Sequence, residues 1–471
     1  MDVINELVRY VVRARYEDLP DQTIQVVKKT IIDTLGVAIA GSTALGCKPL
    51  VNLVKEWGGK EESSIIVYGG KVPAPDAALA NCTMARALDF DDVRLATAEP
   101  PRRAGGHLSA TTVPGSFVLA EYSGKPVNGK SFILANALGS DLHCRLRQAA
   151  SSEFFEGWTE TTAPFGIVAT GGKLLGFDEE TMLNGMGVAY SQCSFNAQAY
   201  LDGALAVRLQ QGLGARAGVL AVALAERGFT GARNVLQGKY GFYNMFARGK
   251  WEQADLLDEL GERFEVDNIS VKAYPCCAGT HSSIYGVLEI VKEHDIKSQE
   301  IDEITVNTTS YGYNLLAYSE EGDTKHNPRT IVDAQFSIPY TVATAAVKRK
   351  VFLDDFSQEA IKNPDVLQIA QKVKVIADPE LDKLVAANKG EPPVRIAMKT
   401  KDGACYTREV QYVKGHPKNA MTMAECIQKF KDCTRFSTKP LPQKNINTVI
   451  QMTEALEEID DVTEIVKLLS L

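Results

Sequence analysis

The sequence predicts a mainly α-helical protein, in which a large all-helical domain carries an inserted, smaller α/β lid domain. Three observations support this prediction. Apolar residues recur at three- and four-residue spacing over most of the first 240 residues, as in amphipathic helices. Segments that alternate apolar with polar residues, and that are rich in β-branched side chains, follow after residue 265. Because residues 423–471 return to the helical spacing, we expect the helical domain to span 1–265 and 416–471, and the lid domain 266–415.

The helical domain is predicted from this spacing, element by element. The first helix covers residues 3–11, and the second covers 23–41, with Gly41 at a plausible C-cap position. Many of the following helices are rich in Ala and Gly, as closely packed buried helices require. Helices and strands do not alternate here, so a doubly wound sheet fits poorly. The further helical patterns cover residues 77–88, 111–122, 131–146, 165–175, 179–192 and 212–226.

The lid domain is predicted to combine strands with helices. The segments 269–275 and 303–310 alternate apolar and polar residues. Residues 394–400 and 405–413 do the same, and the Asp402–Gly403 turn between them is a strong hairpin signal. Helical patterns intervene at 282–292, 336–349 and 365–372.

Composition narrows the classes of function. The chain has 471 residues, and 51 Lys and Arg against 59 Asp and Glu give a formal charge of −8, which disfavours binding to nucleic acid. A small anionic substrate is compatible with this charge, because a few local cations outweigh a weak mean field. No stretch approaches the ~18–20 apolar residues of a membrane span, and the N-terminal segment lacks the apolar core of a secretory signal. The nine cysteines form no CxxC pair, which favours free thiols in a reducing compartment, so we expect a cytoplasmic enzyme or binding protein.

The densest polar cluster lies between residues 85 and 114. Three carboxylates within four positions repel one another, so burial raises the pKa of at least one of them toward the range of a general acid or base. A histidine within reach supplies the complementary proton donor or acceptor. The alternative is that Asp91 and Asp92 cap and solvate a helix end. The cluster consists of Asp89, Asp91 and Asp92, then Arg102, Arg103 and His107 after a Pro- and Gly-rich loop.

A second cluster contains Lys272, Cys276, Cys277 and His281. A Cys–His nucleophile pair is one interpretation, because a thiolate needs a nearby base. A buried thiol beside a structural histidine is the other. Lys272 is predicted to point into a cleft and bind a carboxylate. The chain has no HxxxH or HxH arrangement, so no metal centre is expected.

Two further sequence patterns are better explained by a structural role than by a functional site. The GLGARAG segment at 212–218 mimics a dinucleotide fingerprint, but it lies inside an Ala-rich helical run, where close helix packing explains the glycines. His143 lies in a helical pattern between Asp141 and Arg145, whose i, i+4 spacing is typical of a surface pair.

The chain resembles the MmgE/PrpD family over nearly its whole length. Each matching phrase is weak alone, but eight of them in register are specific. The phrases are IIDTLGVAIAGS from residue 31, ALDFDD from 87, GHLSATTVP from 106, KLLGFD from 173, RLQQGLGARAGVLAVALAERGFTG from 208, KAYPCC from 272 with His281 following, AQFSIPY from 334 and V-x-G-x-P-x-N-x-M-T from 413.

The resemblance implies both an architecture and a chemistry. The family includes 2-methylcitrate dehydratase, cis-aconitate decarboxylase and iminodisuccinate epimerase. Its members share a large helical domain with a smaller α/β lid, generally form homodimers and need no metal or organic cofactor. Their chemistry is proton transfer next to a carboxylate. The resemblance implies that the family's active-site aspartate and histidine correspond to Asp89 and His107, and Lys272 matches the lysine of the family's K-x-aromatic-P phrase.

Departures from the family pattern argue against cis-aconitate decarboxylase activity. Val93 stands where the family usually has Thr, and the loop before His107 carries an insertion with the two arginines. No histidine lies between residues 158 and 173, where dehydratases and decarboxylases carry one. The decarboxylase lysine falls at Val207, beside Arg208, and the decarboxylase histidine falls at Cys277, four residues before His281.

The resulting hypothesis is a cofactor-independent lyase that eliminates water from a small hydroxy-carboxylate, similar to 2-methylcitrate dehydratase. His107 transfers the proton, Asp89 orients it, and Arg208 and Lys272 hold carboxylate oxygens. One alternative is an epimerase or isomerase that uses His107 and His281, and another is an inactive helical scaffold. The predicted substrate-binding residues also include Asp92, Cys277, Arg102 and Arg103. The two arginines are included because Arg binds carboxylates bidentately.

Overall fold

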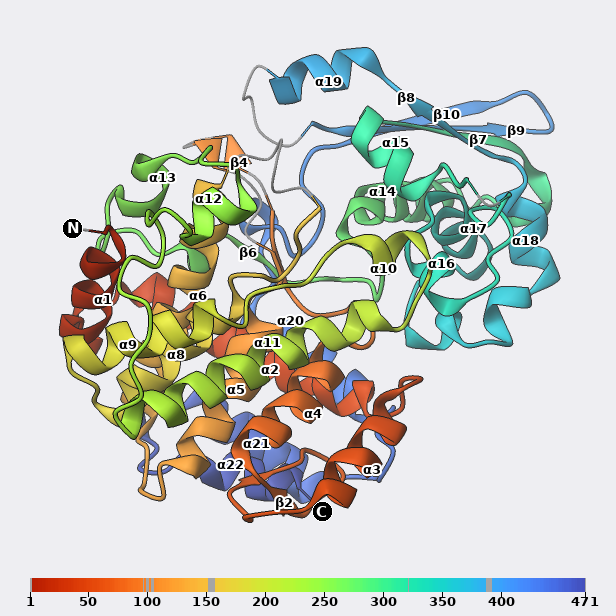
Figure 1. Cartoon of the computed structure of the whole chain (residues 1–471). Helices are drawn as coiled ribbons and strands as arrows, with labels where there is room; N and C mark the ends of the chain where they lie inside the picture. The colour runs from red at the N-terminus through yellow and green to blue at the C-terminus, as the bar shows by residue number, and fades with distance from the viewer. Residues whose placement is uncertain are drawn as a thin grey trace.

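The computed structural model describes residues 2–95, 97–98, 101–102, 106–150, 157–320, 322–386 and 392–470. The described chain is mainly helical and contains one four-stranded sheet, as Figure 1 shows. The mainly helical class predicted from the sequence is therefore confirmed. Within the described ranges, we find no helix of the length and apolarity that crossing a membrane requires.

The first half of the chain folds as a stack of helices. The predicted helices are found close to their expected positions, whereas α3, α10, α12 and α13 were not predicted. Side-chain caps define two of the starts: Asn128 accepts a hydrogen bond from the Ser131 amide, and Asp178 accepts one from the Thr181 amide. The helices are α1 (Ile4–Arg13), α2 (Asp21–Gly41), α3 (Cys47–Trp57), α4 (Ala74–Arg86), α5 (Ser109–Tyr122), α6 (Gly129–Ala149), α8 (Ala163–Leu175), α9 (Glu179–Tyr190), α10 (Gln198–Leu201), α11 (Ala206–Glu226), α12 (Phe242–Phe246) and α13 (Gln253–Leu257).

Glycines set the close approach of these helices. A Cβ on Gly212 would overlap Thr83 and the Leu79 carbonyl, so α11 lies directly against α4, and the packing interpretation of GLGARAG is confirmed. Gly41 is the last residue of α2 rather than the predicted C-cap, which is Ser42. Its role is also contact, because a Cβ there would overlap the Met84 carbonyl of α4.

The four-stranded sheet lies in the second half of the chain. The strands are β7 (Ile301–Thr308), β8 (Val373–Ala377), β9 (Val394–Thr400) and β10 (Cys405–Val410), in the spatial order β10-β9-β7-β8. The predicted hairpin of β9 and β10 is confirmed, and β7 pairs antiparallel with β9. β8, which pairs parallel with β7, was not predicted, because a five-residue strand with a distant partner leaves little local signal.

The predicted strand over 269–275 is largely wrong. Only β6 (Ile269–Ser270) is extended there, and it pairs with β3 (Val93–Arg94) next to the acidic cluster. Residues 269–272 are all buried beside that cluster, so the apolar and polar alternation here does not mark a strand of the four-stranded sheet. A short hairpin of β4 (Thr97–Ala98) and β5 (Pro101–Arg102) follows β3, and β1 (Ser63–Ser64) pairs with β2 (Lys71–Val72).

Helices cover the sheet, and the C-terminal helices return to the first half of the chain. α14 packs on β9 and β10, α17 packs on β8, and α20 packs on α2 (Figure 1). The remaining helices are α14 (His281–Glu293), α15 (Ser310–Leu316), α16 (Ile331–Gln335), α17 (Ile338–Lys348), α18 (Pro364–Ala370), α19 (Pro379–Ala386), α20 (Met423–Thr434), α21 (Gln443–Glu454) and α22 (Thr463–Leu469).

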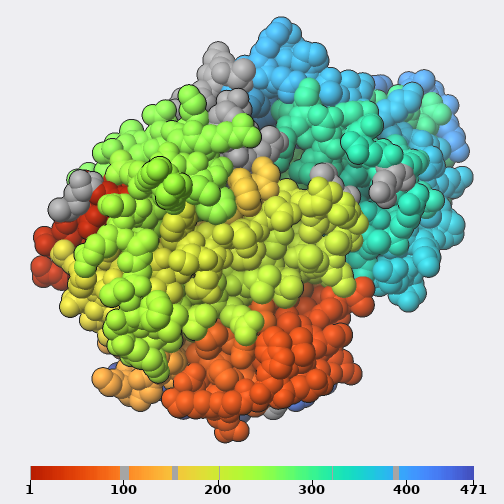
Figure 2. Space-filling model, viewed as in Figure 1, coloured from red at the N-terminus to blue at the C-terminus, as the bar shows by residue number. Residues whose placement is uncertain are grey.

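Two hydrophobic cores follow from this arrangement. The larger core joins residues from both ends of the chain, whereas the buried members of the second all fall between Cys276 and Val410. We call these the helical part and the sheet part. Figure 2 shows the yellow and green surface of the helical part lying against the teal surface of the sheet part. That the sheet part acts as an inserted lid stays a prediction.

Replacing Gly212 by Ala is expected to destabilise the fold. The added methyl group meets Thr83 and the α4 backbone, and overpacking of this kind typically costs about 1–3 kcal/mol. Urea denaturation followed by circular dichroism measures the loss. Gly157→Ala is the matched control, since a Cβ at that position meets nothing within 4 Å. Equal stability of the two variants would contradict the packing role of Gly212.

Candidate active site

The turn after α4 folds two carboxylates back onto a buried arginine. Asp89 adopts a left-handed conformation with φ of 51°, which a short polar side chain tolerates and which reverses the chain. The guanidinium of Arg86 contacts Asp89 and lies 3.4 Å from Asp91 Oδ1. Burial raises the pKa of both carboxyl groups, but the nearby cations outweigh it and hold both pKa values below their usual range. Both carboxylates are therefore ionised at neutral pH.

His107 pairs with Asp91, not with Asp89 as predicted. Its Nδ1 lies 2.9 Å from Asp91 Oδ2 and 3.1 Å from the Asp92 carbonyl oxygen. Both partners are acceptors, so Nδ1 carries the proton and Nε2 is left as a base. Within the described ranges, every hydrogen bond found for this ring involves Nδ1. The side chain is 16% exposed, so solvent or a ligand reaches it.

Lys272 is buried against Asp89 instead of pointing into a cleft. Its Nζ lies 3.1 Å from Asp89 Oδ1 and donates a hydrogen bond of 2.9 Å to the Asp89 carbonyl. The lysine fixes the aspartate and helps to keep it ionised. Lys272 is predicted to contact substrate, but its ammonium group already binds Asp89. Its first role is therefore to hold the turn after α4 in place.

Asp92 fulfils the alternative interpretation, that of a helix cap. Its two carboxylate oxygens accept hydrogen bonds from the Ser109 amide and from the Ser109 hydroxyl, at 3.1 and 2.6 Å, at the start of α5. It is not solvated as that interpretation assumed, since it is fully buried. Burial raises the pKa of Asp92 to about 7, and Asp91 adds to this effect. A substrate contact is not consistent with both oxygens being used here.

Arg208 is a buried cation with an amide as its partner. It lies at the start of α11, is 5% exposed, and donates to Gln335 Oε1 at 3.2 Å. Gln335 in turn donates to the Leu88 and Pro275 carbonyls, so its amide orientation is fixed. No ion pair with Arg208 is found across the described residues, and burial lowers the pKa of its guanidinium. That Arg208 holds a substrate carboxylate stays a prediction.

His281 and Cys277 lie near Lys272, but their surroundings make them weak acid–base groups. His281 is buried, its Nε2 lies 3.2 Å from the Cys276 carbonyl, and burial lowers its pKa to about 3. It therefore stays neutral and holds the turn before α14. Burial raises the pKa of the Cys277 thiol to about 11, so it stays protonated. The interpretation of a buried thiol beside a structural histidine agrees with Cys276, which is fully buried, whereas Cys277 is half-buried.

The two arginines that are predicted to bind substrate lie in a segment that the structure describes only in part. The backbone of Arg102 belongs to β5, and Arg103 lies outside the described residues. The hypothesis that this loop contacts substrate stays a prediction.

Lys429 is a further buried charge at this site, and it was not predicted. From α20, its Nζ lies 2.8 Å from Asp33 Oδ1 and donates to the Phe90 and Lys272 carbonyls at 2.9 Å. It thus joins α2, the turn after α4 and the end of β6. One signal was present in the sequence: Lys429 lies on the apolar face of its helix, between the buried Cys426 and Cys433.

A metal ion does not fit the acidic turn well. Asp89, Asp91 and His107 each offer one ligand atom, and these atoms lie within 4.8 Å of one another. The carboxylates already contact Arg86 and Lys272, whose positive charges oppose a divalent cation at the same place. The same group of residues is well suited to proton transfer.

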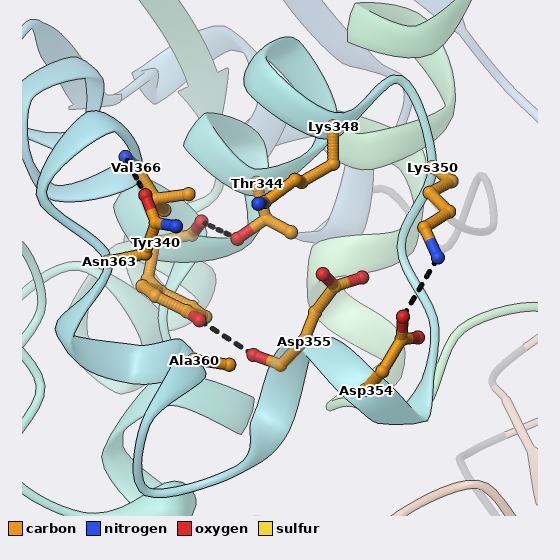
Figure 3. Close-up of a pocket in the computed structure, with 9 residues that line it drawn as sticks. All are labelled: Tyr340, Thr344, Lys348, Lys350, Asp354, Asp355, Ala360, Asn363 and Val366. Atoms are coloured by element: carbon orange, nitrogen blue, oxygen red, sulfur yellow. Dashed lines mark hydrogen bonds and ion pairs between the residues drawn. The ribbon is translucent and has the colours of Figure 1, made fainter.

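A surface pocket in the sheet part lies apart from this site. Its volume is about 280 Å³. Figure 3 shows its lining residues, which include Tyr340 and Thr344 of α17 and Val366 of α18. Its polar groups largely bond to one another, as in the Lys350–Asp354 ion pair and the hydrogen bond from the Tyr340 hydroxyl to the Asp355 carbonyl. We assign no chemistry to it.

Two family models together match most of the chain. A model of the MmgE/PrpD N-terminal domain matches residues 5–254, and a model of the MmgE/PrpD C-terminal domain matches residues 274–455. The chain belongs to the MmgE/PrpD family. The resemblance identified from the eight phrases is thereby confirmed, and Asp89, Asp91, His107 and Arg208 all fall within the N-terminal family domain.

Curated relatives of this MmgE/PrpD protein are distant but match along the whole chain. A protein named cis-aconitate decarboxylase from Aspergillus terreus is 24% identical over 475 residues, which cover 96% of this chain and 93% of the relative. Proteins of the same name from Mus musculus and Homo sapiens are each 22% identical to this chain. Each alignment covers 96% of this chain, and the two alignments cover 90% of the Mus musculus protein and 91% of the Homo sapiens protein.

Replacing Asp92 by Asn is expected to change how stability depends on pH. The folded protein raises the pKa of Asp92 to about 7, above the ~3.9 of an unfolded chain, so the folded state holds this proton from about pH 4 to 7. The stability contributed by protonated Asp92 is complete below about pH 4 and is lost as the pH rises through 7. Urea denaturation from pH 4 to 8 should show the wild type losing a few kcal/mol relative to the variant. A difference that stays constant with pH would contradict this assignment.

Proposed function

We propose that this MmgE/PrpD protein is a cofactor-independent lyase that eliminates water from a small hydroxy-carboxylate. The observation that carries the proposal is the His107–Asp91 pair, whose free Nε2 is the only feature of the acidic turn suited to accepting a proton within the part of the chain described. Family membership and the relatives named as decarboxylases support a lyase acting on small carboxylates. The hydro-lyase reaction and the 2-methylcitrate-like substrate are our finer proposals.

The proposed reaction begins at the carbon next to the substrate carboxylate. His107 Nε2 accepts a proton from that carbon, and the Asp91 carboxylate stabilises the resulting imidazolium. Arg208 binds the carboxylate and stabilises the negative charge that spreads onto its oxygens. The C–O bond to the hydroxyl group then breaks as the C=C bond forms. The imidazolium returns its proton to the leaving hydroxyl, so one water is released for each double bond formed.

Two features favour this reaction over the alternatives. An epimerase needs acid–base groups on both faces of one carbon, and His281, the predicted second group, is neutral, buried and hydrogen bonded to a carbonyl. For decarboxylation, the position of the expected lysine holds the buried Val207, and that of the expected histidine holds the protonated Cys277. Neither side chain is positioned to transfer a proton.

Activity is expected to depend on His107. NMR in D2O would follow a set of hydroxy di- and tricarboxylates and their unsaturated partners, and we expect water loss or addition with one of them. His107→Gln should lower kcat by about 10²–10⁴, the usual contribution of a general base. In the screen, release of CO2 would instead indicate a decarboxylase, and deuterium exchange without water loss would indicate an epimerase. If the His107→Gln variant turned over within a fewfold of the wild-type rate, His107 would not be the general base.

Substrate affinity is expected to depend on Arg208. Arg208→Gln removes the cation but keeps an amide, so the KM for the carboxylate identified in the screen should rise about 10–100-fold, as charged hydrogen bonds of ~1.5–3 kcal/mol imply. Arg216→Gln is the matched control: it lies on the same helix but faces outward and pairs with Asp76. Equal KM values for the two variants would exclude Arg208 as the carboxylate-binding group.

A further inference from the structure

Arg208 differs from the other buried arginines in the kind of partner that it has. Four arginines are buried in the described part of the chain, and Arg208 is one of them. The other three each pair with a carboxylate, Arg86 with Asp89, Arg94 with Glu265 and Arg145 with Asp141. The last of these pairs is fully buried, so its prediction as a surface pair is wrong. Arg208 Nη2 instead donates a hydrogen bond of 3.2 Å to the side-chain oxygen of Gln335, which is a neutral amide.

Two carbonyl groups hold the amide of Gln335 in one orientation. Its Nε2 donates to the Leu88 carbonyl at 2.7 Å and to the Pro275 carbonyl at 3.2 Å. Because only the NH2 end of an amide can donate, the oxygen end faces Arg208. The backbone of Gln335 is also held, since its carbonyl accepts a hydrogen bond of 3.0 Å from the Cys277 amide. Gln335 is 2% exposed and so has little contact with water.

These hydrogen bonds join the two family domains at the acidic turn. Arg208 and Leu88 belong to the N-terminal family domain, and the residue after Leu88 is Asp89. Pro275 and Gln335 belong to the C-terminal family domain. The guanidinium of Arg208 is therefore held by a side chain from the other family domain, and that same side chain is bonded to the turn that carries the candidate active site.

A neutral partner has a specific consequence for a cation that binds an anion. A carboxylate in place of this amide would neutralise the guanidinium and compete with an anionic ligand for its N–H groups. The amide oxygen fixes the direction of the guanidinium and leaves its charge uncompensated. A guanidinium has five N–H donors, and within the described ranges the bond to Gln335 is the one hydrogen bond found for the Arg208 side chain. The remaining donors suffice for a bidentate contact with a carboxylate.

We propose that Gln335 is a positioning residue for substrate binding, whose amide fixes the guanidinium of Arg208 and, because it is neutral, leaves the charge of Arg208 to the substrate carboxylate. This inference rests on the proposed function for the role of Arg208 as the carboxylate-binding group. It adds that the affinity for the carboxylate depends on a residue of the C-terminal family domain that is bonded to Arg208.

The first test is the kinetics of Gln335→Glu with whichever carboxylate the NMR screen shows to be turned over. This change keeps the shape of the side chain and places a negative charge against Arg208. The KM should therefore rise about 10–100-fold, as for Arg208→Gln, and by more than kcat falls. Gln443→Glu is the matched control, since it adds the same charge at an exposed residue that bonds to Asn447, and it should leave KM unchanged.

A double-mutant cycle separates the loss of charge from damage to the fold. If Gln335→Glu acts by neutralising Arg208, it should have little further effect on KM in a protein that already carries Arg208→Gln, because the charge is no longer present. Damage to the packing would instead add in full to the effect of Arg208→Gln. That additive result, or a wild-type KM in Gln335→Glu alone, would overturn the proposal.

A crystal structure of the substrate-free Gln335→Met variant tests the positioning role without any measurement of activity. Methionine has a similar length but no amide, so the guanidinium of Arg208 should leave its place or take several orientations. Gln335→Asn, whose amide is one methylene too short to make the same contacts, serves if the methionine variant does not fold. A guanidinium that stays in place in the folded variant would overturn the proposal. If the screen finds no carboxylate that is turned over, the proposed lyase function fails, and this structure still decides whether Gln335 positions Arg208.

Discussion

Charge compensation in the interior is the constraint on which this structure depends. Three buried carboxylates, Asp33, Asp89 and Asp91, meet three buried cations, Arg86, Lys272 and Lys429. An unpaired charge at such a depth costs several kcal/mol, so each member requires the others to be in place. The six side chains come from α2, α4 and its turn, the segment after β6, and α20. The site therefore forms only when both ends of the chain have packed together.

This compensation separates groups that build the site from groups that are available for chemistry. Asp89 and Lys272 satisfy each other, and Asp92 satisfies the start of α5. His107 Nε2 and the guanidinium of Arg208 are less fully engaged, and they are the two groups that a proton transfer beside a carboxylate requires. The charge-compensated side chains packed around a partly exposed histidine are a physical reason for the site to be preorganised.

The curated relatives are 22–24% identical to this chain and match it along nearly its whole length. Val207 and Cys277 place an apolar side chain and a protonated thiol at two positions where the family resemblance predicts proton-transferring groups.

The sequence by itself determined the helical class, most helix positions, the hairpin of β9 and β10, and the acidic turn with its histidine. Each leaves a local pattern: a period of 3.6, an alternation closed by Asp402–Gly403, or a cluster within a few positions. Tertiary structure alone decided that Asp91 orients His107, that Lys272 holds Asp89, and that Lys429 and Gln335 lie at the site. Periodicity records which residues are buried, but the pairing of buried charges depends on contacts between segments up to several hundred residues apart, and these leave no local pattern.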